Sequence, residues 1–224
     1  MAPPFAIDPA GFPMVWVEAI AAWMQWLPLS RLELERYLSA ARDRRIDQAW
    51  YGRLLAMNLA VAPSRIDSGS YVEALLTRIV PAEAERFAAG LGEGFALPTV
   101  EQWRRAWSAL TALPAERGLP AVFARLGLEE PVRELLARIE SAHLSFVATT
   151  RPRRQRTLAD QMLMRYGVFE WAWRSEPPGR WVGIGEPRPV LGVALGSPDR
   201  GPAVPDRPET FRSYLYGCRL IRRR

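Results

Sequence analysis

The stretch FALPTVEQWRRAW, residues 95–107, combines a rigid turn with a heavy aromatic helix face. The proline fixes the backbone on entry, and Thr99 and Gln102 have the spacing of a capping box, in which each side chain satisfies a free amide at the other residue. Trp103 and Trp107 lie one helical turn apart on the same face. The stretch therefore predicts a corner at which a capped helix docks into a core through its tryptophans.

Further helices are predicted before and after this corner. Pro81 and Gly92 mark the start and the end of one helix, since proline suits a first helical turn and glycine suits a helix end. Ser30 and Glu33 have capping-box spacing and predict the start of another. That helix should cover residues 31–44, and two more helical regions are expected at residues 47–57 and 115–146.

Strand-like segments flank this helical part. FPMVWV, residues 12–17, predicts an early strand, and short apolar pieces separated by glycine and proline predict several more after Met164. Helices followed by irregular strands favour an α+β fold over a doubly wound sheet. No repeat or linker divides the chain, so we expect a single domain over residues 1–224, with a mobile loop at about 197–210.

The charged residues restrict the chemistry. All thirty basic residues are arginine, which excludes a lysine Schiff base and a P-loop lysine. A net charge of +6 and a pI near 10.2 permit an acidic protein partner or a nucleic acid. Cys218 is the only cysteine, so an internal disulfide is excluded and a reducing compartment fits.

The N-terminal sequence MAPPFAIDPAG has no basic region followed by an apolar one, so no signal peptide is expected. The apolar run Ala19–Leu29 is interrupted by Gln25 and Pro28, and it is too short to span a bilayer core of about 30 Å. We therefore expect a cytoplasmic protein without a membrane segment.

Four motifs, in order, resemble the formylglycine-generating enzymes, also called sulfatase-modifying factors. LPTVEQWRRA, residues 97–106, resembles their Leu-Pro-Thr-Glu-x-Glu-Trp signature, and residues 79–92 resemble the helix before it. YGVFEWAW, residues 166–173, resembles their Gly-Asn-Val-Trp-Glu-Trp motif, and YGCRLIR, residues 216–222, their closing Gly-Phe-Arg-Leu segment. The resemblance implies a C-type-lectin-like fold, with helices in the N-terminal two thirds, a small twisted antiparallel sheet and long loops, and residues 115–146 as a helical insertion.

The resemblance assigns structural roles, rather than catalytic ones, to ten positions within these motifs. They are Leu97, Pro98, Thr99, Glu101, Trp103, Gly167, Glu170, Trp171, Gly217 and Arg219.

The chain departs from the family where the family does chemistry. The family's oxidase uses two nearby cysteines that bind copper, and relatives that form sulfur–carbon bonds hold iron with three histidines. This chain has one cysteine and one histidine, His143, so it has neither ligand set. The resemblance therefore implies a non-catalytic member that needs no cofactor and has no catalytic or metal-binding residue.

Four single residues have alternative interpretations. Cys218 is a reactive thiol beside a cation or a small buried residue packed near Tyr216, and we favour burial. His143 is a metal ligand or base, or a hydrogen-bonded histidine at a helix end, and we favour the latter. Glu101 and Glu170 form an acid–base pair or hold indole and backbone donors, and the resemblance favours the second interpretation.

A binding surface is expected in the basic and aromatic part of the chain. Its candidate residues are Arg151, Arg153, Arg154, Arg156, Trp181, Arg188, Tyr214 and Tyr216. The arginines are not interleaved with stacking aromatics, so a protein partner is favoured over nucleic acid. No membrane partner is expected.

These observations favour a non-catalytic recognition or adaptor module that binds a protein, in a bacterial multi-component defence or signalling system. The alternatives are a divergent metal-dependent oxidoreductase that uses Glu170, His143 and Cys218, a basic nucleic-acid-binding protein, and a ligand-binding variable protein of a retroelement diversified over about residues 181–216.

Overall fold

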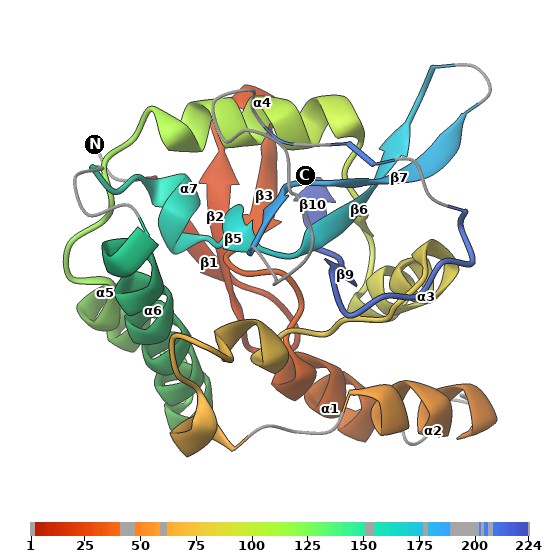
Figure 1. Ribbon diagram of the computed structural model, residues 1–224, viewed down its shortest axis with the longest axis horizontal. Coiled ribbons are helices and arrows are strands. Elements are labelled where there is room, and N and C mark those ends of the chain that lie inside the picture. The colour runs from red at the N-terminus through yellow and green to blue at the C-terminus, as the bar shows by residue number, and fades with distance from the viewer. Residues whose placement is uncertain are drawn as a thin grey trace.

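The computed structural model describes residues 3–40, 48–58, 62–150, 155–176, 179–188, 202, 204–205 and 208–223 (Figure 1). Several predictions lie outside these residues. They are the last part of the helix expected over 31–44, the strand expected over 189–196, most of the loop expected over 197–210, and the surface residues Arg151, Arg153 and Arg154.

The largest sheet joins the two ends of the chain. Its five strands have the order β1-β2-β3-β10-β4 and are all antiparallel. Their bounds are β1 Phe5–Ile7, β2 Pro13–Val17, β3 Ala22–Gln25, β4 Phe95–Ala96 and β10 Ile221–Arg223. The last strand enters between β3 and β4, where Ile221 is paired with Met24 on one side and Ala96 on the other.

Two smaller sheets contain parallel pairs. One pairs β5 Arg165–Gly167 with β8 Glu186–Pro187, and the other has the order β7-β6-β9, with bounds β7 Arg180–Ile184, β6 Phe169–Arg174 and β9 Tyr216–Gly217. β6 pairs antiparallel with β7 but parallel with β9. The expected antiparallel sheet is present as the five-stranded sheet, and the parallel pairs β5–β8 and β6–β9 were not predicted.

Seven α-helices and three short 3₁₀ helices are present among the described residues. The α-helices are α1 Arg31–Ala40, α2 Gln48–Met57, α3 Pro81–Leu91, α4 Val100–Thr111, α5 Leu119–Arg125, α6 Glu130–Thr150 and α7 Leu158–Gln161, and the 3₁₀ helices are η1 Glu18–Ile20, η2 Pro63–Arg65 and η3 Tyr71–Ala74. Helices and antiparallel sheets together confirm the predicted α+β class. The region expected over 115–146 divides into α5 and α6, and α6 continues to residue 150.

The predicted corner is present before α4. The Gln102 amide donates to Thr99 Oγ1 at 3.1 Å, and the Thr99 amide donates to Gln102 Oε1 at 2.9 Å, so both halves of the capping box form. Trp103 is fully buried, whereas Trp107 is half-buried. In Figure 1, α4 lies across one end of β2 and β3, so the first tryptophan docks the helix against the largest sheet.

Two apolar clusters fill the interior. The first joins α4, α5 and α6 to one side of the largest sheet, and the second joins α1 and α3 to β6 and β9. The apolar residues predicted for α3, which are Ala84, Phe87, Ala88 and Leu91, all lie in the second cluster. Within the described part of the chain, no helix has the length and apolar character needed to cross a bilayer.

Candidate functional site

The most buried part of the molecule is an ion pair between two of the predicted motif residues. Glu170 on β6 and Arg219 after β9 are both fully buried, and the guanidinium donates to both carboxylate oxygens at 2.9 and 3.0 Å. Trp103 Nε1 donates to the same carboxylate at 2.8 Å. The Glu170 side chain therefore holds an indole and a guanidinium, and the two partners satisfy both of its oxygens.

Arg219 also ties this pair to the backbone of distant segments. It donates to the carbonyl oxygens of Gln25 and Trp26 at 3.1 and 2.9 Å and to that of Met162 at 2.6 Å. Every hydrogen bond of this side chain is thus made inside the protein. An arginine suits this position because its planar fork reaches several acceptors at once.

The turn after α7 is held in a strained shape by these contacts. Leu163 and Tyr166 have positive φ angles of 55° and 59°, a conformation that costs energy for residues other than glycine. The carbonyl of Met162 accepts from Arg219, and the carbonyl of Tyr166 accepts from the Tyr71 hydroxyl at 2.6 Å. Buried hydrogen bonds on both sides therefore fix the turn.

Trp171 and Tyr216 form the neighbouring aromatic part of the interior. Trp171 is fully buried and donates to the Ile79 carbonyl at 2.7 Å, and its ring lies 4.9 Å from that of Tyr216. The Tyr216 ring covers Gly183, where a Cβ atom would have no room. Tyr216 is only 3% exposed, so its place among the predicted surface residues was wrong.

The remaining predicted motif residues lie around this interior. Leu97 is buried, the Pro98 carbonyl accepts from the Trp173 amide at 3.0 Å, and Gly217 lies against the Leu76 carbonyl with no space for a side chain. Gly167 is buried in β5. Glu101 differs from all of these, because it is exposed on α4 and pairs with Arg105 one turn later.

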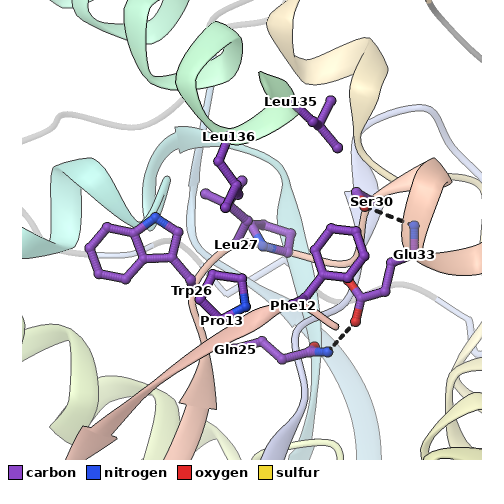
Figure 2. Close-up of a pocket in the computed structure, with 10 residues that line it drawn as sticks. Phe12, Pro13, Gln25, Trp26, Leu27, Ser30, Glu33, Leu135 and Leu136 are labelled. Carbon is purple, nitrogen blue, oxygen red and sulfur yellow. Dashed lines mark hydrogen bonds between the residues drawn. The ribbon is translucent and has the colours of Figure 1, made fainter. Parts of the chain in front are cut away.

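A second buried polar cluster lies at the start of α1. Gln25 donates through Nε2 to Asp8 at 3.1 Å and to Glu33 at 2.5 Å, and its Oε1 accepts from the Leu220 amide at 2.8 Å. Only half of the capping box expected at Ser30 forms. The Glu33 amide donates to Ser30 Oγ, but the Glu33 carboxyl turns into the core toward Gln25 (Figure 2).

Beside this cluster is a small cavity. Figure 2 shows that Phe12, Trp26 and Leu136 surround it together with Glu33. Its volume is about 10 Å³, which is room for about one water molecule. This cavity is too small for a substrate, so the acids beside it have no access to one here.

Asp8 and Glu33 are joined through Gln25, whose side-chain amide donates to both carboxyl groups. Burial raises the pKa of both carboxyl groups, and the neighbouring Asp8 raises the pKa of Glu33 further. Because these pKa values are raised on folding, the stabilisation is complete at low pH and is lost as the pH rises through the native values.

Glu33→Gln is therefore expected to flatten the fall in stability above about pH 4.5. The amide keeps a hydrogen-bonding group but cannot ionise. The free energy of unfolding of the variant at pH 7 should therefore exceed that of the wild type by more than about 0.5 kcal/mol. Urea unfolding between pH 4 and 8 measures this, with the half-buried Glu35→Gln on the same helix as control. Parallel curves for wild type and Glu33→Gln would contradict the expectation.

Cys218 lies in the second apolar cluster and is fully buried. Burial raises the pKa of its thiol well above the usual value, and the charges of Glu170, Glu33 and Glu83 raise it further. A high pKa disfavours the thiolate that nucleophilic attack and metal binding require. The favoured interpretation as a buried residue in the same cluster as Tyr216 is confirmed.

His143 differs from its prediction. It lies within α6 rather than at a helix end, its ring is 5.4 Å from that of Tyr71, and its Nε2 is buried without a hydrogen-bond partner. The prediction of a hydrogen-bonded helix-end histidine was wrong, because α6 extends one turn further than the sequence indicated. Burial lowers the pKa of His143 to about 4, partly opposed by Asp160 and aided by Arg156.

The three residues proposed for an oxidoreductase do not form a common site. Glu170 accepts hydrogen bonds from Arg219 and Trp103. Cys218 is buried in the second apolar cluster, whereas His143 is buried against the ring of Tyr71. In the part of the chain that the structure describes, no three histidine, cysteine or acidic side chains lie close enough to hold a metal ion.

Two arginines predicted for the surface are bound to the fold. Arg156 lies 3.8 Å from Glu140, and burial lowers its pKa. Arg188 is half-buried, with its guanidinium 4.9 Å from the Phe146 ring centre and 5.4 Å from that of Tyr71. These contacts make both side chains part of the packing around α6.

Three half-buried aromatic residues and one exposed aromatic residue lie on the β6–β7 hairpin and on the segment before β9. Trp173 and Trp181 face each other across the strands with ring centres 5.1 Å apart, and both are half-buried. The Trp181 amide contacts Glu209 Oε1 at 3.5 Å, which connects the hairpin to the segment before β9. In that segment Phe211 is half-buried, and Tyr214 is 54% exposed.

We call Trp173, Trp181, Phe211 and Tyr214 the hairpin face. Figure 1 shows the hairpin projecting beyond the body of the molecule. Among the described residues, Tyr214 is the one large hydrophobic side chain that is exposed. Trp173 and Phe211 were not predicted as surface residues. Trp173 shares a strand face with the fully buried Trp171, so the spacing of the two tryptophans gave no sign that Trp173 is more exposed.

Comparison of the chain with protein-family models, with characterised proteins and with solved structures gives no match.

Proposed function

We propose that this protein is a non-catalytic recognition module on a formylglycine-generating-enzyme-like scaffold, and that it binds a protein partner through the hairpin face. The observation that supports this most is the half-buried pair Trp173–Trp181 on a projecting hairpin, which the Trp181–Glu209 contact joins to the segment that carries exposed Tyr214. Tryptophan and tyrosine contribute most strongly to protein interfaces, because they bury a large apolar area and keep a polar edge.

The role of the motif residues supports the non-catalytic part of the proposal. Glu170, the acid of the central motif, accepts from Arg219 and Trp103 and has no exposed surface. The indole N–H of Trp171 donates to the Ile79 carbonyl inside the core. These residues hold the core that positions the β6–β7 hairpin, so the resemblance concerns the scaffold, and a function on its surface is independent of the family's chemistry.

The test is binding to the products of neighbouring genes, each purified and titrated against the chain by calorimetry. We expect one of them to bind and Tyr214→Ala together with Trp181→Ala to weaken that complex by roughly 30-fold, the effect of losing about 2 kcal/mol. Tyr214→Ala alone should weaken it without changing the melting temperature, since this ring is mostly exposed.

Glu101→Ala on the exposed face of α4 is the matched control and should leave affinity unchanged. Equal affinity of wild type and the double variant would show that the partner binds elsewhere. Binding to none of the neighbours would count against the recognition role.

A further inference from the structure

A groove lies between α5 and α6, at the opposite end of the molecule from the β6–β7 hairpin (Figure 1). About 270 Å³ of it is open to water, which is close to the lower size of ligand pockets. Phe123 and Pro120 of α5 and Ala137 of α6 line its apolar part. Phe123 is buried at the base of the groove, whereas Pro120 and Ala137 are exposed. The groove is therefore shallow, and Pro120 and Ala137 form its solvent-facing apolar surface.

The α6 wall has helical periodicity. Glu130, Glu134 and Ala137 are spaced by four and three residues, so they share one face over about two turns, or roughly 10 Å. A wall of this length is long enough to lie along about two turns of a docked helix.

The rim of the groove is acidic although the chain is basic. Glu130, Glu134 and Glu140 line it, and Arg133 is the cation among them. Arg133 is paired with Glu130, and Glu140 accepts from Gln161 and lies near Arg156. Glu134 is exposed, and no ion pair joins it to another described residue. A cation is therefore attracted here, although the chain as a whole has a net charge of +6.

We infer that the α5–α6 groove is a second docking surface, which binds an amphipathic helix of a partner protein that carries arginine or lysine beside its apolar face. The apolar side chains of that helix lie over Pro120 and Ala137, and its cation pairs with Glu134. Nucleic acid is a poor occupant, because the carboxylates of the rim repel phosphate. This surface is separate from the hairpin face, so the module has the two surfaces an adaptor needs.

The test uses two short helix-forming peptides that share leucines at i, i+3, i+4 and i+7, one with arginines beside them and one with glutamates in the same places. Amide chemical shifts of the ¹⁵N-labelled full chain are followed during titration at low salt. We expect the arginine peptide to shift residues of α5 and α6, and the glutamate peptide to leave them unchanged. Glu134→Arg should weaken binding of the arginine peptide at least 10-fold.

Glu85→Arg is the matched control, because Glu85 is also exposed but lies on α3. The affinity of this variant for the arginine peptide should stay within 2-fold of the wild-type affinity. Shifts that are spread over the surface, equal binding of both peptides, or no binding would overturn the proposal. Since the hairpin variants are not used here, failure of this experiment leaves the proposed function of the hairpin face standing, and failure at the hairpin face leaves this surface standing.

Discussion

Arg219→Met is expected to lower the free energy of unfolding by about 3–5 kcal/mol, because it leaves the Glu170 carboxylate buried without its cation. The three main-chain carbonyls that accept from Arg219 lose their donor in the same step. One of them belongs to the strained turn after α7, so the loss extends beyond the ion pair. Urea unfolding at pH 7, followed by tryptophan fluorescence, measures the change.

A double-mutant cycle separates the pair from general disruption. Glu170→Gln removes the charge that Arg219 neutralises, so the double variant Glu170→Gln with Arg219→Met should be less destabilised than the sum of the two single variants, by about 1–3 kcal/mol. Arg219→Lys keeps a charge if the methionine variant fails to fold. The exposed pair Glu101–Arg105 is the control, and its removal should change stability by less than about 1 kcal/mol. A loss below about 1 kcal/mol for Arg219→Met would contradict the account.

His143 is expected to make the fold less stable in acid by about 3 kcal/mol. Its pKa is about 4 in the fold against a usual value of 6.5, and each pKa unit is worth about 1.4 kcal/mol. The unfolded chain therefore takes up a proton between pH 6.5 and 4 that the folded chain refuses, so stability is present above pH 6.5 and is lost as the pH falls to 4.

The measurement is the difference between the wild type and His143→Phe in urea unfolding from pH 7.5 to 4. Phenylalanine suits the site, where the rings of Tyr71 and Tyr166 lie 5.4 and 6.5 Å away. The wild type should lose about 3 kcal/mol relative to the variant over this range. Asp8 and Glu33 act with the opposite sign but are present in both chains, so they cancel. Two curves with a constant separation would refute the predicted titration.

Local signals in the sequence predicted much of the helical framework. The capping box at Thr99, the proline start and glycine end of α3, and the apolar face of α3 depend on residues within one or two turns of each other. The α+β class followed from the order of these elements. Such features are fixed by short-range contacts, and short-range contacts are visible in the spacing of residues.

Long-range pairings were out of reach for the same reason. Ser30 and Glu33 have the spacing of a capping box, but Glu33 instead joins Gln25 and Asp8 inside the core. The strands β10 and β3 pair although their partner residues are at least 197 positions apart in the sequence, as Ile221 and Met24 show. The Glu33 side chain thus makes a long-range hydrogen bond to Gln25, and no local pattern of residues reports such a contact.

The candidate site was predicted in part. The sequence singled out Trp181 and Tyr214, which do lie at the exposed hairpin and its neighbouring segment. It placed Tyr216 there too, because tyrosine tolerates both surface and core, and only the position of Gly183 beneath the ring decides for the core. Arg188 was assigned to the surface by its charge, but two aromatic rings on separate elements hold it.

The most direct test of the recognition role is the footprint of the partner on this chain. Amide hydrogen–deuterium exchange is measured for the chain alone and for its complex with the neighbouring-gene product that binds it. We predict slower exchange in β6, β7 and residues 208–216, which carry the hairpin face. Slower exchange confined to other segments, with these three unchanged, would contradict the assignment of the hairpin face as the binding surface.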